Sequence, residues 1–228
     1  MNLSFLSLLG WTFAAGLLWT LRIALLPNGL VSLNGVEWTD LGTYPFFAFL
    51  IWNLFLAWVP YGISTWLVRR KASLWSWGSL LGLLAWLLFL PNAPYLLTDL
   101  IHLHPRGNVP YWLDTSLLVT FAVAGWLVGL ASLRSIHLRF WTHLPQWQQL
   151  GLISFVLAAS SYGVYVGRFL RLNSWDVFTQ PISTFWLLID PILHPFQFGQ
   201  SLLMVPIVAG LLLLSYSSFL TTEKTSIL

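Results

Sequence analysis

Six long apolar segments constrain the fold of this chain more than any other feature of its sequence. A membrane hydrocarbon core of about 30 Å takes about 20 helical residues to cross, and six segments reach that length. They are Leu3–Leu26, Tyr44–Val68, Leu74–Leu97, Leu113–Leu133, Leu150–Leu170 and Ser201–Leu220. The sequence therefore predicts an all-α fold, a polytopic transmembrane helix bundle of about six spans that forms a single transmembrane domain over residues 1–228.

The composition supports a membrane protein and excludes several other classes. Hydrophobic residues make up 57% of the chain and charged residues 7%, against about 45–50% and about 25% in a soluble domain. The 10 Lys and Arg residues are scattered, which argues against a nucleic-acid partner. Cysteine is absent, so disulfides and thiolate metal sites are excluded. No cofactor motif is present, and we expect no bound cofactor.

The loop charges predict the orientation of the chain. One side would hold six basic residues, namely Arg69, Arg70, Lys71, Arg134, Arg139 and Lys224. Cytoplasmic loops carry an excess of Lys and Arg, so we expect both termini in the cytoplasm. The short apolar segment Pro181–Pro195, which precedes the last span, cannot cross the bilayer and is expected to lie at its interface.

Small residues four positions apart predict which spans pack closely. They occur as Gly78/Gly82, Gly125/Gly129 and Ala159/Gly163/Gly167 in spans three, four and five. Helices in lipid associate by close backbone approach through such residues. These three spans are therefore the expected inner bundle.

Two prolines near the outer end of span three predict a broken helix. Pro91 and Pro94 flank Asn92 and Ala93, and each proline removes a backbone donor and clashes with the preceding turn. The freed carbonyl groups need partners at membrane depth, and Asn92 is placed to supply one. A proline-interrupted span also indicates a binding site.

Polar residues gather at the outer ends of the same three spans. The candidate ligand-binding residues are Asn92, Arg168, Arg171, Asn173 and Asp176, and the candidate catalytic residues are Asp99, His102 and Asp114. Two arginines one turn apart suit a phosphate or carboxylate group. Asp99 and His102 are weak metal candidates, because no strong ligand spacing accompanies them and nearby arginines repel cations. Ser174 fits a helix N-cap better than a nucleophile, since no G-x-S-x-G motif surrounds it.

Three functions remain open at this point. The first is binding of an anionic group, such as a lipid head group, at the outward-facing site. The second is a structural or accessory membrane subunit whose polar cluster is an ion-pair network. The third is a membrane enzyme acting on a lipid or lipid-linked substrate. Membrane lipids are expected partners, and a protein partner or a homo-oligomer is left open. Transport is disfavoured, because the deeper halves of the spans hold few polar residues.

The motifs around the cluster resemble a catalogued family. Pro91-Asn92-Ala93-Pro94-Tyr95, Thr98-Asp99 with His102, Trp112 with Asp114, and Gly167-Arg168 with Arg171 and Asn173 to Asp176 are similar to domain of unknown function 1361. The resemblance is densest over residues 86–176. It implies a multi-pass protein of the bacterial cytoplasmic membrane whose activity is unassigned.

Overall fold

The computed structural model describes residues 5–24, 47–70, 73, 75–104 and 110–225. Regular secondary structure within these residues is helical, with no strand. Among the described residues, five helical segments are long and apolar enough to cross a membrane, and they are Phe5–Ala24, Ala48–Arg69, Trp77–His102, Tyr111–Trp141 and Gln146–Leu170. The predicted all-α membrane fold is confirmed.

The five segments correspond to the first five predicted spans. They contain α1 (Phe5–Ala24), α3 (Ala48–Arg69), α4 (Trp77–Phe89) with α5 (Asn92–Thr98) and η2 (Asp99–His102), α6 (Tyr111–Ile136) with η3 (His137–Trp141), and α7 (Gln146–Tyr165) with η4 (Val166–Leu170). The sixth predicted span falls on α11 (Met204–Thr225). Its apolar part, Met204–Ser218, is shorter than the other five.

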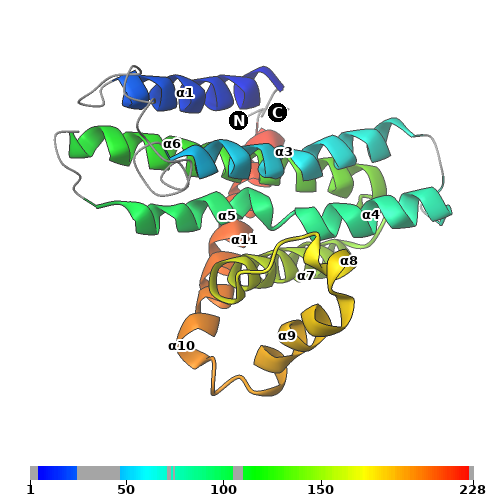
Figure 1. Ribbon diagram of the computed structural model, residues 1–228. Coiled ribbons are helices and arrows are strands. Elements are labelled where there is room, and N and C mark those ends of the chain that lie inside the picture. The colour runs from blue at the N-terminus through cyan, green and yellow to red at the C-terminus, as the bar shows by residue number, and fades with distance from the viewer. Residues whose placement is uncertain (1–4, 25–46, 71–72, 74, 105–109, 226–228) are drawn as a thin grey trace.

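Helix α6 lies at the centre of the bundle. It contacts α1, α3 and α5, while α3 also packs against α4 and α5. In Figure 1, α1, α3, α6 and the α4–α5 pair run side by side, whereas α11 crosses behind them at a steep angle and packs on α7. The short helices α8 (Asp176–Thr179), α9 (Pro181–Leu193) and α10 (Gly199–Leu202) form a separate arm beside α7.

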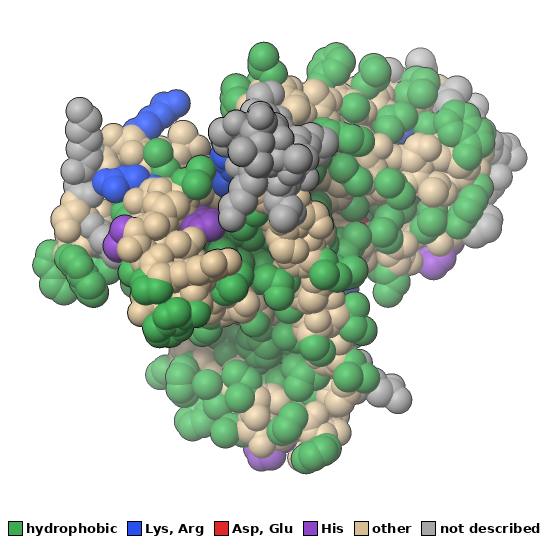
Figure 2. All heavy atoms as spheres, turned by 180° about the vertical axis from the view of Figure 1, so that it is seen from behind, with side chains coloured by type: hydrophobic (Ala, Val, Ile, Leu, Met, Phe, Trp, Pro, Cys, Tyr) green, Lys and Arg blue, Asp and Glu red, His purple; other side chains and the backbone are tan. Residues whose placement is uncertain are grey.

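The surface is apolar over most of the face shown in Figure 2. Green hydrophobic side chains cover both the bundle and the arm, and most of the blue Lys and Arg side chains on this face lie toward one end of the bundle. In Figure 1 that is the end where α3 stops and α4 begins, at Arg69 and Arg70. The predicted basic side of the membrane thus corresponds to one end of the bundle. The cytoplasmic assignment of that end stays a prediction.

The proline pair breaks span three as predicted. Helix α4 ends at Phe89 and α5 begins at Asn92, with Leu90 and Pro91 between them. The Asn92 side-chain Nδ2 donates a hydrogen bond of 2.9 Å to the backbone oxygen of Phe89. Pro94 has no N–H to donate to the oxygen of Leu90, and the N–H of Ala93 donates to that oxygen instead (3.1 Å). The Phe89 carbonyl therefore lacks its usual helical partner, and the Asn92 side chain takes that place.

The predicted small residues hold the broken segment from both sides. A side-chain carbon at Gly129 of α6 would lie 2.9 Å from Ala93 Cβ, and one at Gly125 would overlap Leu96. A carbon at Gly163 of α7 would meet the Pro91 ring, and one at Gly167 of η4 would meet the Tyr95 ring. Pro91 and helix α5 therefore fit between α6 and the α7–η4 segment only because these four positions lack a side chain.

Buried polar contacts connect the helices elsewhere in the bundle. The Trp86 indole N–H donates to Ser132 Oγ (2.9 Å), and the Ser132 hydroxyl donates to Ser64 Oγ (3.2 Å), which joins α4, α6 and α3. His137, in the basic segment between spans four and five, is buried and contacts Tyr216 Oη and Gln149 Oε1, each at 2.8 Å. That segment is therefore a packed junction of η3, α7 and α11.

Candidate functional site

A cavity of about 960 Å³ opens beside the broken segment. Its walls come from α3, from α4, α5 and η2, from α7 and η4, and from the chain that returns past Arg171 into α8 and α9. The polar side chains that line it are Asn53, Asn92, Tyr95, His102, His104, Tyr162, Arg168, Arg171, Asn173, Ser174 and Thr184. Two arginines are present, and no Asp or Glu belongs to the described lining. Of the two, Arg168 is paired with Asp99 behind the lining, so Arg171 carries the positive charge that has no counter-charge among the described residues, and that charge favours an anion.

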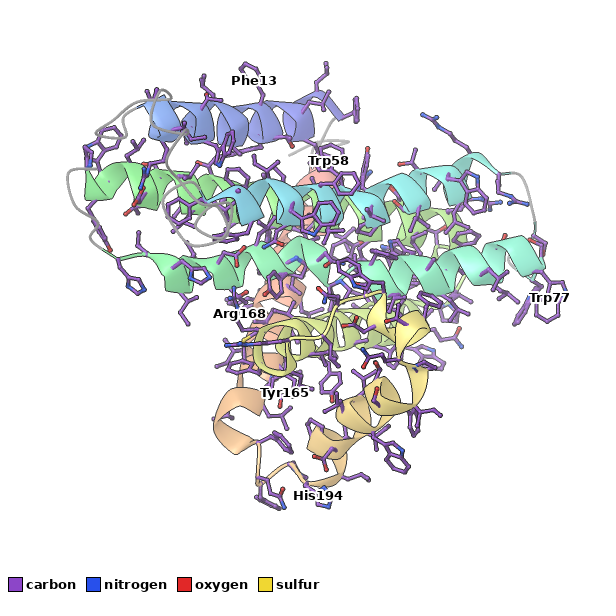
Figure 3. All side chains as sticks on the ribbon, in the orientation of Figure 1. Phe13, Trp58, Trp77, Tyr165, Arg168 and His194 are labelled. Carbon is purple, nitrogen blue, oxygen red and sulfur yellow. The ribbon has the colours of Figure 1, made fainter. Side chains whose placement is uncertain are left out.

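Arg168 is held rigidly at the edge of this cavity. Its Nη2 donates to Asp99 Oδ1 (2.6 Å) and to Thr98 Oγ1 (2.6 Å), and its Nε donates to Thr98 Oγ1 (2.9 Å). The guanidinium carbon also lies 4.9 Å from the centre of the Tyr95 ring. Figure 3 shows Arg168 between η4 and the α5 segment, while Tyr165 lies lower, on the side of the arm. Among these described contacts Nη1 takes no part, which leaves two donors near the cavity.

Asp99 acts as the buried anchor of Arg168. Its side chain is 2% exposed. Its second oxygen, Oδ2, accepts a 3.0 Å hydrogen bond from Asn53 Nδ2 on α3. Both carboxylate oxygens are thus occupied, and Asp99 is not part of the cavity lining. The arrangement ties α3, η2 and η4 together and fixes the position of the Arg168 guanidinium.

Arg171 is placed in the cavity wall by an unusual backbone conformation. It caps η4 with φ 56° and ψ 32°, in the left-handed region, and its N–H donates to the oxygen of Val166. Glycine is the usual residue at such a position, and a side chain there costs about 1 kcal/mol. Within the described chain Arg171 makes no ion pair or side-chain hydrogen bond. Its guanidinium is therefore the second cation of the site, and it is available to a ligand.

Asn92 and Ser174 join the helix break to the returning chain. Asn92 Nδ2 donates to Ser174 Oγ (3.2 Å), and the Ser174 hydroxyl donates to the backbone oxygen of Leu88 (3.4 Å). Ser174 is not an N-cap, because α8 is capped by Trp175 without a side-chain hydrogen bond. Asn92 remains in the cavity wall with its carbonyl oxygen unused among the described contacts.

Asn173 and Asp176 belong to one turn. Asp176 Oδ2 accepts hydrogen bonds from the backbone N–H of Asn173 (2.6 Å) and from its Nδ2 (3.4 Å). Asn173 lines the cavity and Asp176 does not. The Asp176 carboxylate therefore stabilises the turn that carries Asn173, and it contacts that turn and not the cavity.

Asp114 is placed apart from the other candidates. It is buried and pairs with Arg22 of α1 at 2.6 Å, each side chain being 2% exposed. The sequence predicts that Asp114 joins the polar residues at the ends of spans three and five. In the structure its ion-pair partner, Arg22, comes from span one. The contact between α1 and α6 brings these two residues together, and no pattern local to span four indicates it.

His102 and His104 both line the cavity, and the His102 ring packs 5.2 Å from the Phe49 ring. In the described part of the chain no three His, Asp or Glu residues lie together in a way that could hold a metal ion. Of the two weak metal candidates, Asp99 contacts Arg168 and Asn53, and the His102 ring packs against the Phe49 ring.

The sequence alone did not place three polar lining residues in the site, namely Asn53, Tyr162 and Thr184. Asn53 is the one amide side chain inside an otherwise apolar span. A polar residue in such a place needs a buried polar partner, and this requirement could have predicted its contact with Asp99. Tyr162 and Thr184 gave no such signal, because their partners are backbone oxygens brought close only by the fold.

The fold and the cavity define a multi-pass membrane protein with an arginine-lined cavity beside a broken span. The chain belongs to the family described as "Protein of unknown function (DUF1361)", which matches residues 52–215. That range contains every residue of the cavity lining. No curated protein and no solved structure matches the chain.

Proposed function

We propose that this membrane protein binds an anionic group in the cavity beside α5, at its outer face, and that a lipid head group is the natural source. The observation that carries this proposal is the described lining, which contains Arg168 and Arg171 but no carboxylate. Arg168 is fixed by Thr98 and Asp99, and Arg171 has no competing partner in the described chain. A fixed guanidinium and a second, unpaired guanidinium in the same cavity suit phosphate or carboxylate oxygens.

We also propose that the protein lies in the cytoplasmic membrane with both termini inside, which the excess of Lys and Arg at the opposite end of the bundle supports. In that orientation α5 and η4 lie at the outer end of the bundle, where head groups of the outer leaflet are available. The head group would contact Arg171 and the remaining Nη1 donors of Arg168, with Asn92 and Asn173 beside them.

The structural alternative has its own support in Asp99. The Arg168–Asp99 pair connects two helices and a third through Asn53, which is the pattern of an ion-pair network. Arg171 distinguishes ligand binding from a purely structural role. It lines the cavity, and it has no structural partner among the described residues. An enzyme would need a base that faces the ligand, and Asp99 does not line the cavity, whereas His102 does.

The experiment is native mass spectrometry of protein released from native-lipid nanodiscs. Wild type, Arg171→Gln and Arg69→Gln are compared, and melting temperatures are recorded on the same samples. Arg69 is the matched control, because it is an exposed arginine outside this cavity. We expect wild type and Arg69→Gln to retain a phosphate- or carboxylate-bearing molecule that an equally stable Arg171→Gln loses. Equal retention by all three proteins, or no anionic adduct on wild type, would contradict the proposal.

A further inference from the structure

The cavity changes from polar to apolar along the helices that form it. On span three, the lining residues before the break are Leu84, Leu87 and Leu88, and those after it include Asn92 and Tyr95. At about 1.5 Å per helical residue, Leu84 and Tyr95 are separated by roughly 16 Å along the span. One end of the cavity is therefore hydrocarbon and the other is polar.

Span five repeats the same gradient in the same direction. Its lining begins with Ala159 and ends with Arg168, roughly 13 Å further along the helix. Gly163 faces Pro91, and Gly167, four residues later, faces Tyr95, four residues after Pro91. The two segments thus run parallel here, and their apolar ends coincide.

The polar atoms of the apolar end are already satisfied within the protein. The Tyr162 hydroxyl donates to the oxygen of Leu188 (2.5 Å), and the Thr184 hydroxyl donates to the oxygen of Asp176 (3.1 Å). Because a hydroxyl with an internal partner has little need of a ligand oxygen, this end offers mainly carbon. The unused donors of Arg168 and Arg171 lie at the other end.

The cavity is also open toward the surroundings of the bundle through apolar residues. Trp52 and Leu84 line it and are 53% and 65% exposed. Both belong to helices that are long and apolar enough to cross the membrane, so their exposed surfaces would face lipid. A volume of about 960 Å³ is at the upper end of the range for drug-sized ligands, and a lone phosphate would leave most of it unfilled.

We infer that the ligand is an amphiphile, with an anionic head at Arg168 and Arg171 and a hydrocarbon chain along Leu84, Leu88, Ala159 and Leu188, which enters sideways from the bilayer. This inference rests on the proposed anion site and adds the chemical class of the ligand. Burying the chain gives little free energy beyond what lipid already supplies. Membrane confinement instead raises the effective concentration of the head group at the arginines.

The test compares a ligand that has chains with one that lacks them. Phosphatidate is doped into phosphatidylcholine nanodiscs, glycerol phosphate is added to detergent-solubilised protein, and retention is measured by native mass spectrometry. Ala159→Trp fills the apolar end, and Ala158→Trp is the matched control, because Ala158 is exposed and outside the lining. We expect Ala159→Trp to lose phosphatidate by at least about tenfold while Ala158→Trp retains it, with glycerol phosphate binding unchanged in both.

The outcomes separate the two claims. Equal phosphatidate retention by the two tryptophan variants, or equal wild-type affinity for glycerol phosphate and phosphatidate, overturns the amphiphile while leaving the anion site. If Arg171→Gln binds both ligands like wild type, the anion site itself is refuted.

A second measurement needs no substitution. A phosphatidate with a diazirine at the end of its acyl chain is photolysed with wild-type protein. Cross-links are expected at Leu84, Leu88 or Ala159. Cross-links confined to lipid-facing positions outside the cavity, such as Phe155, would refute the inference.

Discussion

Replacing Asp99 by Asn removes the anionic partner of Arg168 and almost nothing else. The carboxylate accepts from Arg168 at 2.6 Å through one oxygen and from Asn53 at 3.0 Å through the other. An asparagine side chain has a single acceptor oxygen, so one of these two donors must face an NH2 group. The substitution therefore loses at least one hydrogen bond and leaves the arginine without a counter-charge.

The structure sets the size of the effect. Breaking a fully buried ion pair by removing one partner costs about 3–5 kcal/mol of unfolding free energy. Asp99 is 2% exposed, but Arg168 is 17% exposed at the cavity edge, where water screens part of its charge. We therefore expect Asp99→Asn to lower stability by about 3 kcal/mol, at the lower end of that range.

The assay is a double-mutant cycle on the free energy of unfolding in detergent, with Asp99→Asn, Arg168→Met and the double variant. The cycle cancels the contribution of the hydrogen bonds between Arg168 and Thr98, because Asp99 takes no part in them. Residues in direct contact couple by about 0.5–3 kcal/mol, and this pair should lie near 2–3 kcal/mol. A coupling below about 0.5 kcal/mol would show that the pair is not an energetic anchor.

Three further predictions test other parts of the structure. Gly163→Ala should destabilise the protein by about 1–3 kcal/mol, because its new carbon meets the Pro91 ring. In the control Gly151→Ala, on the same helix, the new carbon meets nothing within 4 Å, so this variant should be at least as stable as wild type, because alanine favours a helix over glycine. Equal unfolding free energies of the two variants would contradict the close packing. His137→Phe should cost about 1–3 kcal/mol through loss of the bonds to Tyr216 and Gln149, and thermal melts should show no such loss for the exposed His143→Phe. Because the chain has no cysteine, His104→Cys should react with an impermeant thiol reagent on intact cells and Ser73→Cys should not; the opposite labelling would invert the orientation.

Much of the fold was predictable because it depends on solvent and local chemistry. A bilayer cannot satisfy exposed backbone groups, so long apolar segments must be helices. Pro91 and Pro94 break span three wherever it packs, and the glycines of spans four and five permit close approach. The participation of Asn92 in the break also followed from the need to satisfy a freed carbonyl.

The partners of the charged residues were decided only by the tertiary structure. Asp114 and Arg22 lie on different spans, and their pairing depends on α1 packing against α6. Asp99 takes both Arg168 and Asn53 as partners, which leaves Arg171 as the freer cation of the cavity. The sequence by itself determined a helical membrane chain and the residues available to a polar site. Which of them became structural anchors and which face the cavity was decided by the packing, because an ion pair forms between whichever opposite charges the helices bring within a few ångströms.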